Sequence, residues 1–278
     1  MKELAGKVAV VTGGASGIGR AMAERFQAGG MKIVLADIEG DALKQTVSEL
    51  SASGPVVALH TDVAKAEDVQ ALAEFALHSF GGVHVLCNNA GVGMGGAIWE
   101  HSVKDWEWLL GVNVWGVVHG VRTFVPIMLN QREECHIVNT ASAAGLDPRP
   151  WLGMYSASKS AVVAISEALQ QELAMTGAKI GVSVLCPAIV NTRIGEAERN
   201  RPAALTNDSD DEAPPQAVAF GEAFKAALAQ GLPPEKVADE VLAAILGDRF
   251  YILTHGDSEA RIRSHFERIL HDATMAAH

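Results

Sequence analysis

Short apolar segments alternate with helix-like segments along most of this chain. The apolar segments have the length of strands and are apolar at consecutive positions, which is typical of strands covered on both faces. The segments between them carry apolar residues at a period near 3.6, as helices do. Such alternation joins parallel strands through right-handed helical crossovers. The sequence therefore predicts an α/β fold, a single domain over residues 1–278 with a doubly wound parallel sheet.

The expected elements can be placed by residue range. Strands are expected at residues 7–12, 31–37, 56–62, 83–88, 135–141, 180–186 and 250–254. Helices are expected up to residue 28, at 41–51, 67–80 and 102–129, around Tyr155, and at 216–230, 235–246 and 259–270. Between them, at about 189–232, we expect an insertion that forms a substrate loop and a helix. Its acidic, Pro-rich part at 207–215 is interpreted as a solvated loop rather than a metal site, because the EF-hand pattern and its Gly are absent.

A glycine-rich turn, Thr-Gly-x-x-x-Gly-x-Gly from Thr12, lies between the first strand and the first helix. Glycines at this position permit a tight turn and let the backbone approach a pyrophosphate at the helix N-terminus. The turn therefore predicts a dinucleotide site in a Rossmann-like sheet, although a purely structural turn is the alternative. The expected contacts here are Gly13, Ser16, Gly17, Ile18 and Gly19.

Two carboxylates follow expected strands. Asp37 closes the second strand, where a carboxylate accepts hydrogen bonds from the adenosine ribose and repels a 2′-phosphate. Neither Ser16 nor Ile38 supplies a cation beside it, although Arg20 lies one turn into the first helix. NAD is therefore favoured over NADP. Asp62 follows the third strand, where it either meets the adenine edge or caps the next helix.

Tyr155 and Lys159 are four residues apart in a segment whose apolar stripe, including Ala161 and Ile165, is helical in period. At this spacing the phenol and the ammonium lie one turn apart on one face. A cation there stabilises phenolate and lowers the tyrosine pKa, as a general acid/base near neutral pH requires. The alternative is an exposed Lys beside a packed Tyr. Ser142 ends an apolar strand, so its hydroxyl is expected at a strand's carboxyl end.

In order and separation these motifs resemble those of the short-chain dehydrogenase/reductase family of the cytosolic type, over about residues 5–195. The resemblance is carried by the glycine-rich turn, Asp62, Asn88-Asn89-Ala90-Gly91, Asn113, Ser142, Tyr155 and Lys159. It implies further cofactor contacts at Val63, Asn89, Ala90, Gly91, Tyr155, Lys159, Pro187, Val190 and Thr192. One departure is Ala188, which stands where the family usually has Gly after Pro.

The resemblance also implies a set of catalytic roles. Tyr155 exchanges a proton with the substrate oxygen while a hydride passes between the substrate carbon and nicotinamide. Ser142 hydrogen-bonds the same oxygen. Lys159 lowers the Tyr155 pKa and binds the nicotinamide ribose, and Asn113 holds a water that links Lys159 to solvent. The chain is then an NAD-dependent oxidoreductase, or ketoreductase, acting on a secondary alcohol and its ketone.

The substrate is expected to be hydrophobic or aromatic, because the residues poised around the site are mostly apolar. They are Val92, Met94, Ala143, Leu146, Trp151, Leu152, Ile189 and Ile194, some of which could instead pack the loop. Segments 191–202 and 251–255 resemble the C-terminal parts of dehydrogenases that oxidise benzylic alcohols of aryl ethers. Two alternatives stay open: another reaction on the same fold, such as epimerisation or dehydration, and a non-catalytic dinucleotide sensor.

The net charge and the cysteines limit which binding partners and which cell compartment are expected. The formal net charge is −11 and no basic cluster occurs, so neither nucleic acid nor an anionic membrane is expected as a partner. Cys87, Cys135 and Cys186 lie in or beside apolar strands and are expected to be buried thiols in a reducing compartment. With no signal-like start and no apolar run of about 18 residues, the protein is expected to be cytoplasmic. No spacing suggests a metal site.

Two helices, at 102–129 and around Tyr155, look more apolar than single surface helices need to be. Members of the family that the chain resembles pair through these helices. Closed symmetry is the usual outcome for homo-oligomers. A homotetramer, or a dimer, is therefore expected.

Overall fold

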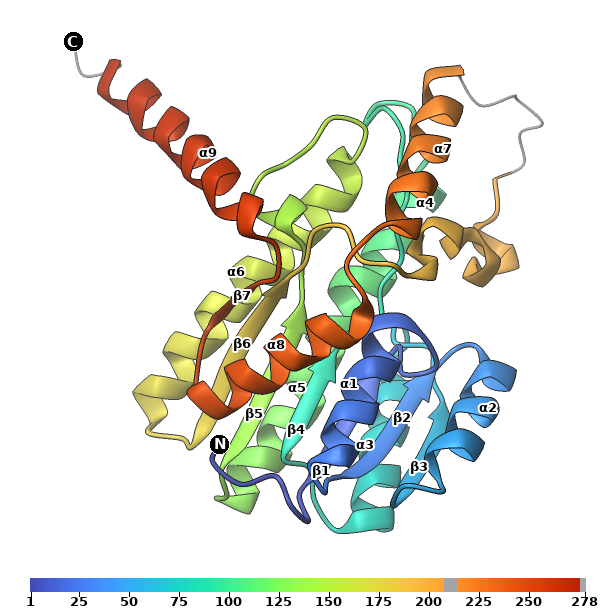
Figure 1. Ribbon diagram of the computed structural model, residues 1–278, viewed down its shortest axis with the longest axis vertical. Helices are drawn as coiled ribbons and strands as arrows, with labels where there is room; N and C mark the ends of the chain where they lie inside the picture. Colours follow the sequence, from blue (N-terminus) through green and yellow to red (C-terminus); the bar gives the residue numbers. More distant parts are fainter. Residues whose placement is uncertain (208–214, 276–278) are drawn as a thin grey trace.

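The computed structural model describes residues 1–207 and 215–275. Within these residues seven parallel strands form one sheet, in the order β3-β2-β1-β4-β5-β6-β7 (Figure 1). The strands are β1 (Val8–Thr12), β2 (Lys32–Asp37), β3 (Val56–His60), β4 (Val85–Asn88), β5 (Cys135–Thr140), β6 (Ile180–Cys186) and β7 (Tyr251–Leu253). The predicted α/β, doubly wound parallel sheet is confirmed.

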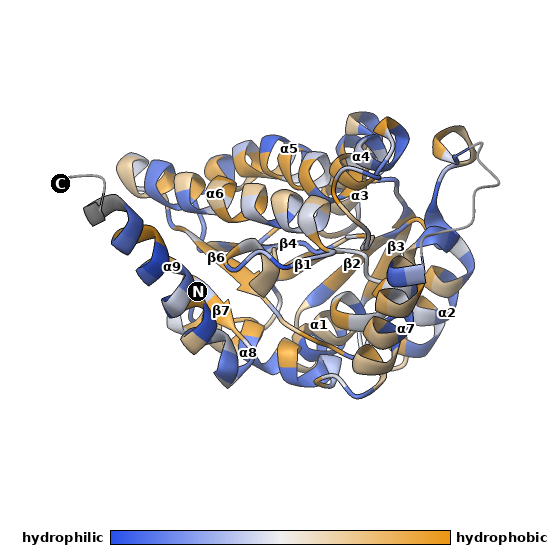
Figure 2. Ribbon diagram, turned by 90° about the horizontal axis from the view of Figure 1, so that it is seen from above, coloured by the Kyte–Doolittle hydropathy of each residue, from blue (hydrophilic) through white to orange (hydrophobic). Residues whose placement is uncertain are grey.

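Helices cover both faces of this sheet (Figure 2). One face carries α1 (Gly17–Ala28), α2 (Gly40–Leu50) and α8 (Pro234–Gly247). The other carries α3 (Ala66–Phe80), α5 (Gly116–Gln131) and α6 (Gly153–Thr176). The remaining elements are α4 (Val103–Leu110), the π turn η1 (Gly111–Trp115), the 3-10 turns η2 (Ala143–Gly145), η3 (Arg193–Asn200) and η4 (Ala203–Leu205), α7 (Pro215–Ala229) and α9 (Gly256–Met275).

Strand β1 illustrates why the apolar segments are continuous rather than alternating. Ala9 and Val11 pack into the core beneath α1 and α8. Val8 and Val10 face the opposite core, beneath α3 and α5. Since both faces of the strand are buried, the four positions from Val8 to Val11 are all apolar.

The strand order reverses direction between β1 and β4, which are neighbours in the sheet. At such a point the two following connections leave on opposite faces, so a crevice opens beyond the carboxyl ends of the strands. The glycine-rich turn follows β1, and the Asn88–Gly91 segment follows β4. The fold therefore gathers the sequence motifs at one edge of the sheet.

The helix predicted at residues 102–129 consists of three parts. A π turn at Gly111–Trp115 separates α4 from α5, and α5 contains Pro126. Contrary to expectation, this stretch (Val103–Gln131) is long and apolar enough to cross a membrane by length and composition, as judged over the described residues. In the fold it packs against α3, α6 and β4. Its other side leaves Trp115 53% and Leu129 40% exposed.

The ends of the expected insertion lie side by side. Asn191 N–H donates to Leu232 O at 3.0 Å, and Leu232 N–H donates to Ile189 O at 2.9 Å. Between these ends the chain forms η3, η4 and α7. Most of the acidic stretch at 207–215 lies outside the described residues. Helix α9 leaves the body and points away from it toward the C-terminus (Figure 1).

Candidate active site

The glycine-rich turn is shaped by close contacts that only glycine allows. Gly13 and Gly17 have φ values of +64° and +51°, in the left-handed region. A Cβ on Gly19 would lie 2.1 Å from Gly13 O and 2.6 Å from Asn89 Nδ2. A Cβ on Gly17 would lie 3.1 Å from Thr192 Cγ2, so the loop after β6 closes on the same turn.

The segment after β4 is fastened to both neighbouring strands. Asn89 N–H and Ala90 N–H both donate to Thr12 Oγ1, at 2.9 and 3.1 Å. The Asn88 amide donates to Asn139 Oδ1 of β5 at 2.8 Å. These bonds fix the three strand ends on which the site is built.

The two predicted carboxylates line the cleft that begins at this turn. Asp37 accepts hydrogen bonds from Ala15 N–H at 2.9 Å and from Glu39 N–H at 3.0 Å. Burial raises the pKa of Asp37 above its usual value. Asp62 accepts from Ala64 N–H at 3.1 Å, whereas the N-cap of α3 is Lys65, so Asp62 does not cap that helix.

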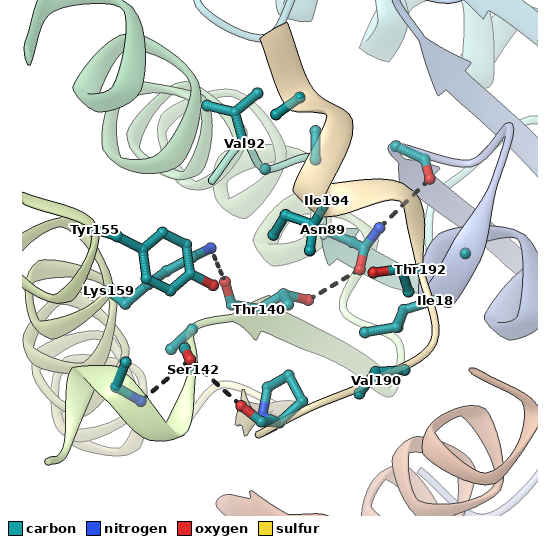
Figure 3. Close-up of a pocket in the computed structure, with 18 of the residues that line it drawn as sticks. Ile18, Asn89, Val92, Thr140, Ser142, Tyr155, Lys159, Val190, Thr192 and Ile194 are labelled. Atoms are coloured by element: carbon teal, nitrogen blue, oxygen red, sulfur yellow. Dashed lines mark hydrogen bonds between the residues drawn. The ribbon is translucent and has the colours of Figure 1, made fainter. Parts of the chain in front are cut away.

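Tyr155 and Lys159 point from α6 toward Ser142 and Thr140 at the end of β5 (Figure 3). Lys159 Nζ donates to Thr140 O at 2.9 Å and lies 5.7 Å from the centroid of the Tyr155 ring. The approach of η2 to α6 requires Gly145, whose Cβ would lie 2.7 Å from the carbonyl carbon of Lys159. Hydroxyl, phenol and ammonium thus meet at one strand end.

Burial, not the neighbouring ammonium, has the largest effect on both titrating groups. It raises the pKa of Tyr155 to about 12, against the smaller effect of a hydrogen bond with Ser142. It lowers the pKa of Lys159 to about 8. The expectation that Lys159 brings the Tyr155 pKa below its ordinary value is therefore not met in this structure.

Lys159 has no carboxylate partner among the contacts that the structure describes, and it is only 3% exposed. Replacing it with Met should therefore stabilise the protein at neutral pH, because the penalty for a buried ammonium disappears. The gain is full below pH 8, where Lys159 is charged in both states, and shrinks as the pH rises from about 8 toward the unfolded-state pKa of 10.5. Urea unfolding of both proteins between pH 7 and 10.5 measures it. A pH-independent difference would contradict this account.

Asn113 lies within the π turn η1. Such π turns often occur at functional sites. Its Oδ1 accepts from Val92 N–H at 2.9 Å, and its Nδ2 donates to Val92 O at 3.0 Å and to Ser158 Oγ at 3.1 Å. A Cβ on Gly91 would lie 3.4 Å from both Asn113 Oδ1 and Lys159 Nζ. Asn113, predicted as a catalytic residue, therefore lies next to Lys159, and its side chain is held by the backbone of Val92.

The cleft brings together most of the predicted residues. Those lining it are Gly13, Ser16, Gly17, Ile18, Asp37, Asp62, Val63, Asn89, Ala90, Gly91, Val92, Ser142, Ala143, Leu152, Tyr155, Lys159, Pro187, Ile189, Val190, Thr192 and Ile194. Gly19 and Asn113 support it from behind. Three predicted pocket residues are not among those that line the cleft. Leu146 packs into the core, Met94 packs in the cluster of Trp108 just behind the cleft, and the Trp151 backbone is left-handed with φ +64°.

His255 is not one of the predicted site residues, but it lines the cleft from the chain after β7. Its Nε2 donates to Ile189 O at 3.0 Å, and its Nδ1 accepts from Ala188 N–H at 3.4 Å. A neutral imidazole with the proton on Nε2 satisfies both bonds. His255 thereby holds the turn that carries Ala188 in place of the glycine usual in the family that the chain resembles.

The residues at this cleft fit a dinucleotide. The backbone of the glycine-rich turn is bare of side chains at Gly13 and Gly17, and the contacts above show that added Cβ atoms would strike neighbours. The Asp37 carboxylate lies at one part of the cleft, and Tyr155 and Lys159 lie at another. One continuous surface thus offers backbone N–H groups that can donate to phosphates and a carboxylate that can accept from ribose hydroxyls.

Known proteins resemble this chain along nearly its whole length. The family model for short chain dehydrogenase matches residues 7–203. A CLA biosynthesis dehydrogenase/reductase of Lactiplantibacillus plantarum is 36% identical and covers 100% of this chain and 98% of its own length. The C alpha-dehydrogenase of a Sphingobium strain is 34% identical and covers 97% and 87%. A Burkholderia phymatum short chain dehydrogenase/reductase, solved with NAD, is 50% identical with a TM-score of 0.95 and covers 98% and 97%.

Proposed function

Since this chain belongs to the short-chain dehydrogenase/reductase family and is an oxidoreductase, we propose that it interconverts a hydrophobic or aromatic secondary alcohol and its ketone with NAD. The observation that carries the proposal is the meeting of Ser142, Tyr155 and Lys159 at the end of β5, in the cleft that also holds the glycine-rich turn. The relatives named above are dehydrogenases or reductases, which favours this reaction over epimerisation, dehydration or a sensor.

In this proposal the chain supplies the proton chemistry. Tyr155 donates its phenolic proton to the ketone oxygen during reduction and accepts it back during alcohol oxidation. The Ser142 hydroxyl donates a hydrogen bond to the same oxygen and stabilises the negative charge that develops there. Lys159, held by Thr140 O, places a cation beside the phenolate that forms. The bound nicotinamide supplies or accepts the hydride.

NAD is proposed over NADP because of Asp37. Its carboxylate lies at the cleft with two backbone N–H donors and is oriented by them. A fixed negative charge accepts hydrogen bonds from a ribose diol and repels a phosphate at the same place. The Burkholderia structure contains NAD, which supports the same preference.

An uncharged, apolar substrate is proposed because of the side chains near Tyr155. Trp108 packs in the same cluster as Tyr155, and Ile194 and Phe224 also line the cleft. The charged side chains beside them are paired with each other: Arg149 Nε lies 3.3 Å from Asp147 Oδ2, and Arg261 Nη1 lies 3.0 Å from Asp257 Oδ2. Each of these arginine charges is thus offset by a neighbouring carboxylate, which favours an uncharged substrate over an anionic one.

The proposal is tested by following absorbance at the NADH band while the protein meets NAD or NADP and a panel of secondary alcohols. The panel runs from small aliphatic alcohols through 1-arylethanols to aryl-ether and steroid alcohols. We expect an aryl or bulky apolar alcohol to be oxidised with reduction of NAD to NADH. Charged hydroxy acids should give little NADH. Turnover of hydroxy acids alone would contradict the proposed substrate class.

A homotetramer is proposed because η1 and the outer side of α5 and α6 expose large apolar residues, among them Trp115 at 53% and Met175 at 87%. Light scattering at micromolar concentration should give the mass of four chains. Trp115→Glu should lower that mass, since a charge would be buried at the contact. Leu246→Glu, at a 45% exposed position on α8, is the matched control and should leave the mass unchanged. A monomeric wild-type protein would contradict the proposal.

A further inference from the structure

Glu39 joins the end of β2 to the insertion at 189–232. Arg199 donates to Glu39 Oε1 from Nε at 3.1 Å and from Nη2 at 2.6 Å, and Asn200 Nδ2 donates to the same oxygen at 3.1 Å. Arg193 Nη1 lies 3.6 Å from Glu39 Oε2. Arg193 is closer to Glu196, at 3.2 Å from Nε to Oε2, so Arg199 is the main partner of Glu39.

The environment makes this a partly shielded cluster. The side chains of Glu39 and Arg199 are only 20% and 25% exposed, whereas Arg193 is 52% exposed. Burial acts to raise the pKa of Glu39, but its hydrogen bonds with Arg199 and Asn200 outweigh burial and lower it. The carboxylate is therefore charged at neutral pH and holds its partners by charge-assisted bonds.

The cluster faces the same part of the cleft as Asp37. Glu39, Arg193, Arg199 and Asn200 all line the cleft, and Glu39 N–H donates to the Asp37 carboxylate. Arg20, the cation that the sequence placed near Asp37, is instead held by Glu24 and Glu49 (at 2.8 and 2.5 Å). The guanidinium groups beside Asp37 thus come from the insertion and not from α1.

We propose that Glu39 is a second determinant of NAD over NADP, because it occupies the Nε and Nη2 donors of Arg199 that could otherwise bind a 2′-phosphate. The inference rests on the proposed function and deepens it. Arginine binds phosphate through paired N–H donors, so an arginine already paired with a carboxylate must lose that partner first. Discrimination between the two cofactors then has two parts: Asp37 repels the 2′-phosphate, and Glu39 keeps the Arg199 guanidinium from binding it.

Two other roles for Glu39 make different predictions. If Glu39 only ties the insertion to β2, its loss should weaken NADH and NADPH binding alike. If it only adds negative charge, its loss should help NADPH whether or not Arg199 is present. Release of the guanidinium group alone predicts a gain for NADPH that depends on Arg199.

The experiment measures dissociation constants of NADH and NADPH by cofactor fluorescence for the full-length wild type, Glu39→Gln, Arg199→Gln and the double variant. Gln retains the size of Glu39 and removes its charge. Glu39→Gln should tighten NADPH binding at least about tenfold, equivalent to about 1.4 kcal/mol, and leave NADH within about threefold, under 0.7 kcal/mol. The double variant should lose this gain while still binding NADH.

Glu198→Gln is the matched control, because Glu198 lies on the same segment and pairs with Arg201 at 3.3 Å, but its side chain is 63% exposed and does not line the cleft. It should change neither dissociation constant. Equal weakening of both cofactors in Glu39→Gln, or a gain that persists in the double variant, would overturn the inference. A wild-type protein that prefers NADPH would contradict the proposed function itself, whereas failure of Glu39→Gln alone overturns only the role of Glu39.

Discussion

Tyr155→Phe is expected to lower both alcohol oxidation and ketone reduction by about 10²- to 10⁴-fold, the usual contribution of general acid–base catalysis. The change removes only the phenolic oxygen that exchanges the proton. The ring stays, packed beside the cluster that contains Val92, Trp108 and Met154. NADH binding should therefore remain within about threefold of wild type, under 0.7 kcal/mol. Steady-state rates and fluorescence titration with NADH measure the two quantities separately.

The chain offers a matched control in Tyr251, its other tyrosine. The Tyr251 hydroxyl is bonded to Glu167 at the β7 edge of the sheet and does not line the cleft. Tyr251→Phe should retain full turnover. A Tyr155→Phe protein that kept its rate within tenfold of wild type would show that another group transfers the proton.

Gly19→Ala is expected to weaken NADH binding by at least about tenfold, or 1.4 kcal/mol. The added Cβ would lie 2.1 Å from Gly13 O and 2.6 Å from Asn89 Nδ2, and the first of these is backbone. Relief requires the glycine-rich turn to shift, which displaces the surface that faces the cofactor. The same crowding should lower the midpoint of urea unfolding. Equilibrium titration with NADH and urea denaturation test the two effects.

Gly221→Ala provides the comparison, since Gly221 lies in α7 and a Cβ there would meet no atom within 4 Å. Alanine is favoured over glycine inside a helix by about 1 kcal/mol, so this variant should be as stable as wild type or more so. If Gly19→Ala bound NADH within threefold of wild type and unfolded at the same urea concentration, the close approach at the turn would not control cofactor binding.

The sequence was sufficient for the sheet, the family and most of the cleft. Buried parallel strands are apolar at most consecutive positions, so they stand out in the sequence, and parallel strands present their carboxyl ends at one edge. Motifs that directly follow strands, such as Gly13 after β1 and Asn89 after β4, are therefore brought together by topology alone. Tyr155 and Lys159 needed only the helical period to be placed on one face.

Other features depend on tertiary placement and have no local pattern. Glu39 and Arg199 are 160 residues apart and meet only because the insertion folds back over β2. The pKa of Tyr155 follows burial, which the spacing to Lys159 does not report. Met94 and Trp151 lie in loops, where no period indicates which side chains turn toward the cleft.

The most direct test of the proposed reaction uses a secondary alcohol that carries deuterium on its carbinol carbon, chosen from the panel group with the highest rate. The protein is mixed with NAD and this alcohol, and the reduced cofactor is analysed by mass spectrometry. We expect one deuterium in each NADH formed, with a ketone as the other product. Undeuterated NADH, or NAD binding without reduction of NAD by any alcohol of the panel, would contradict the proposed reaction.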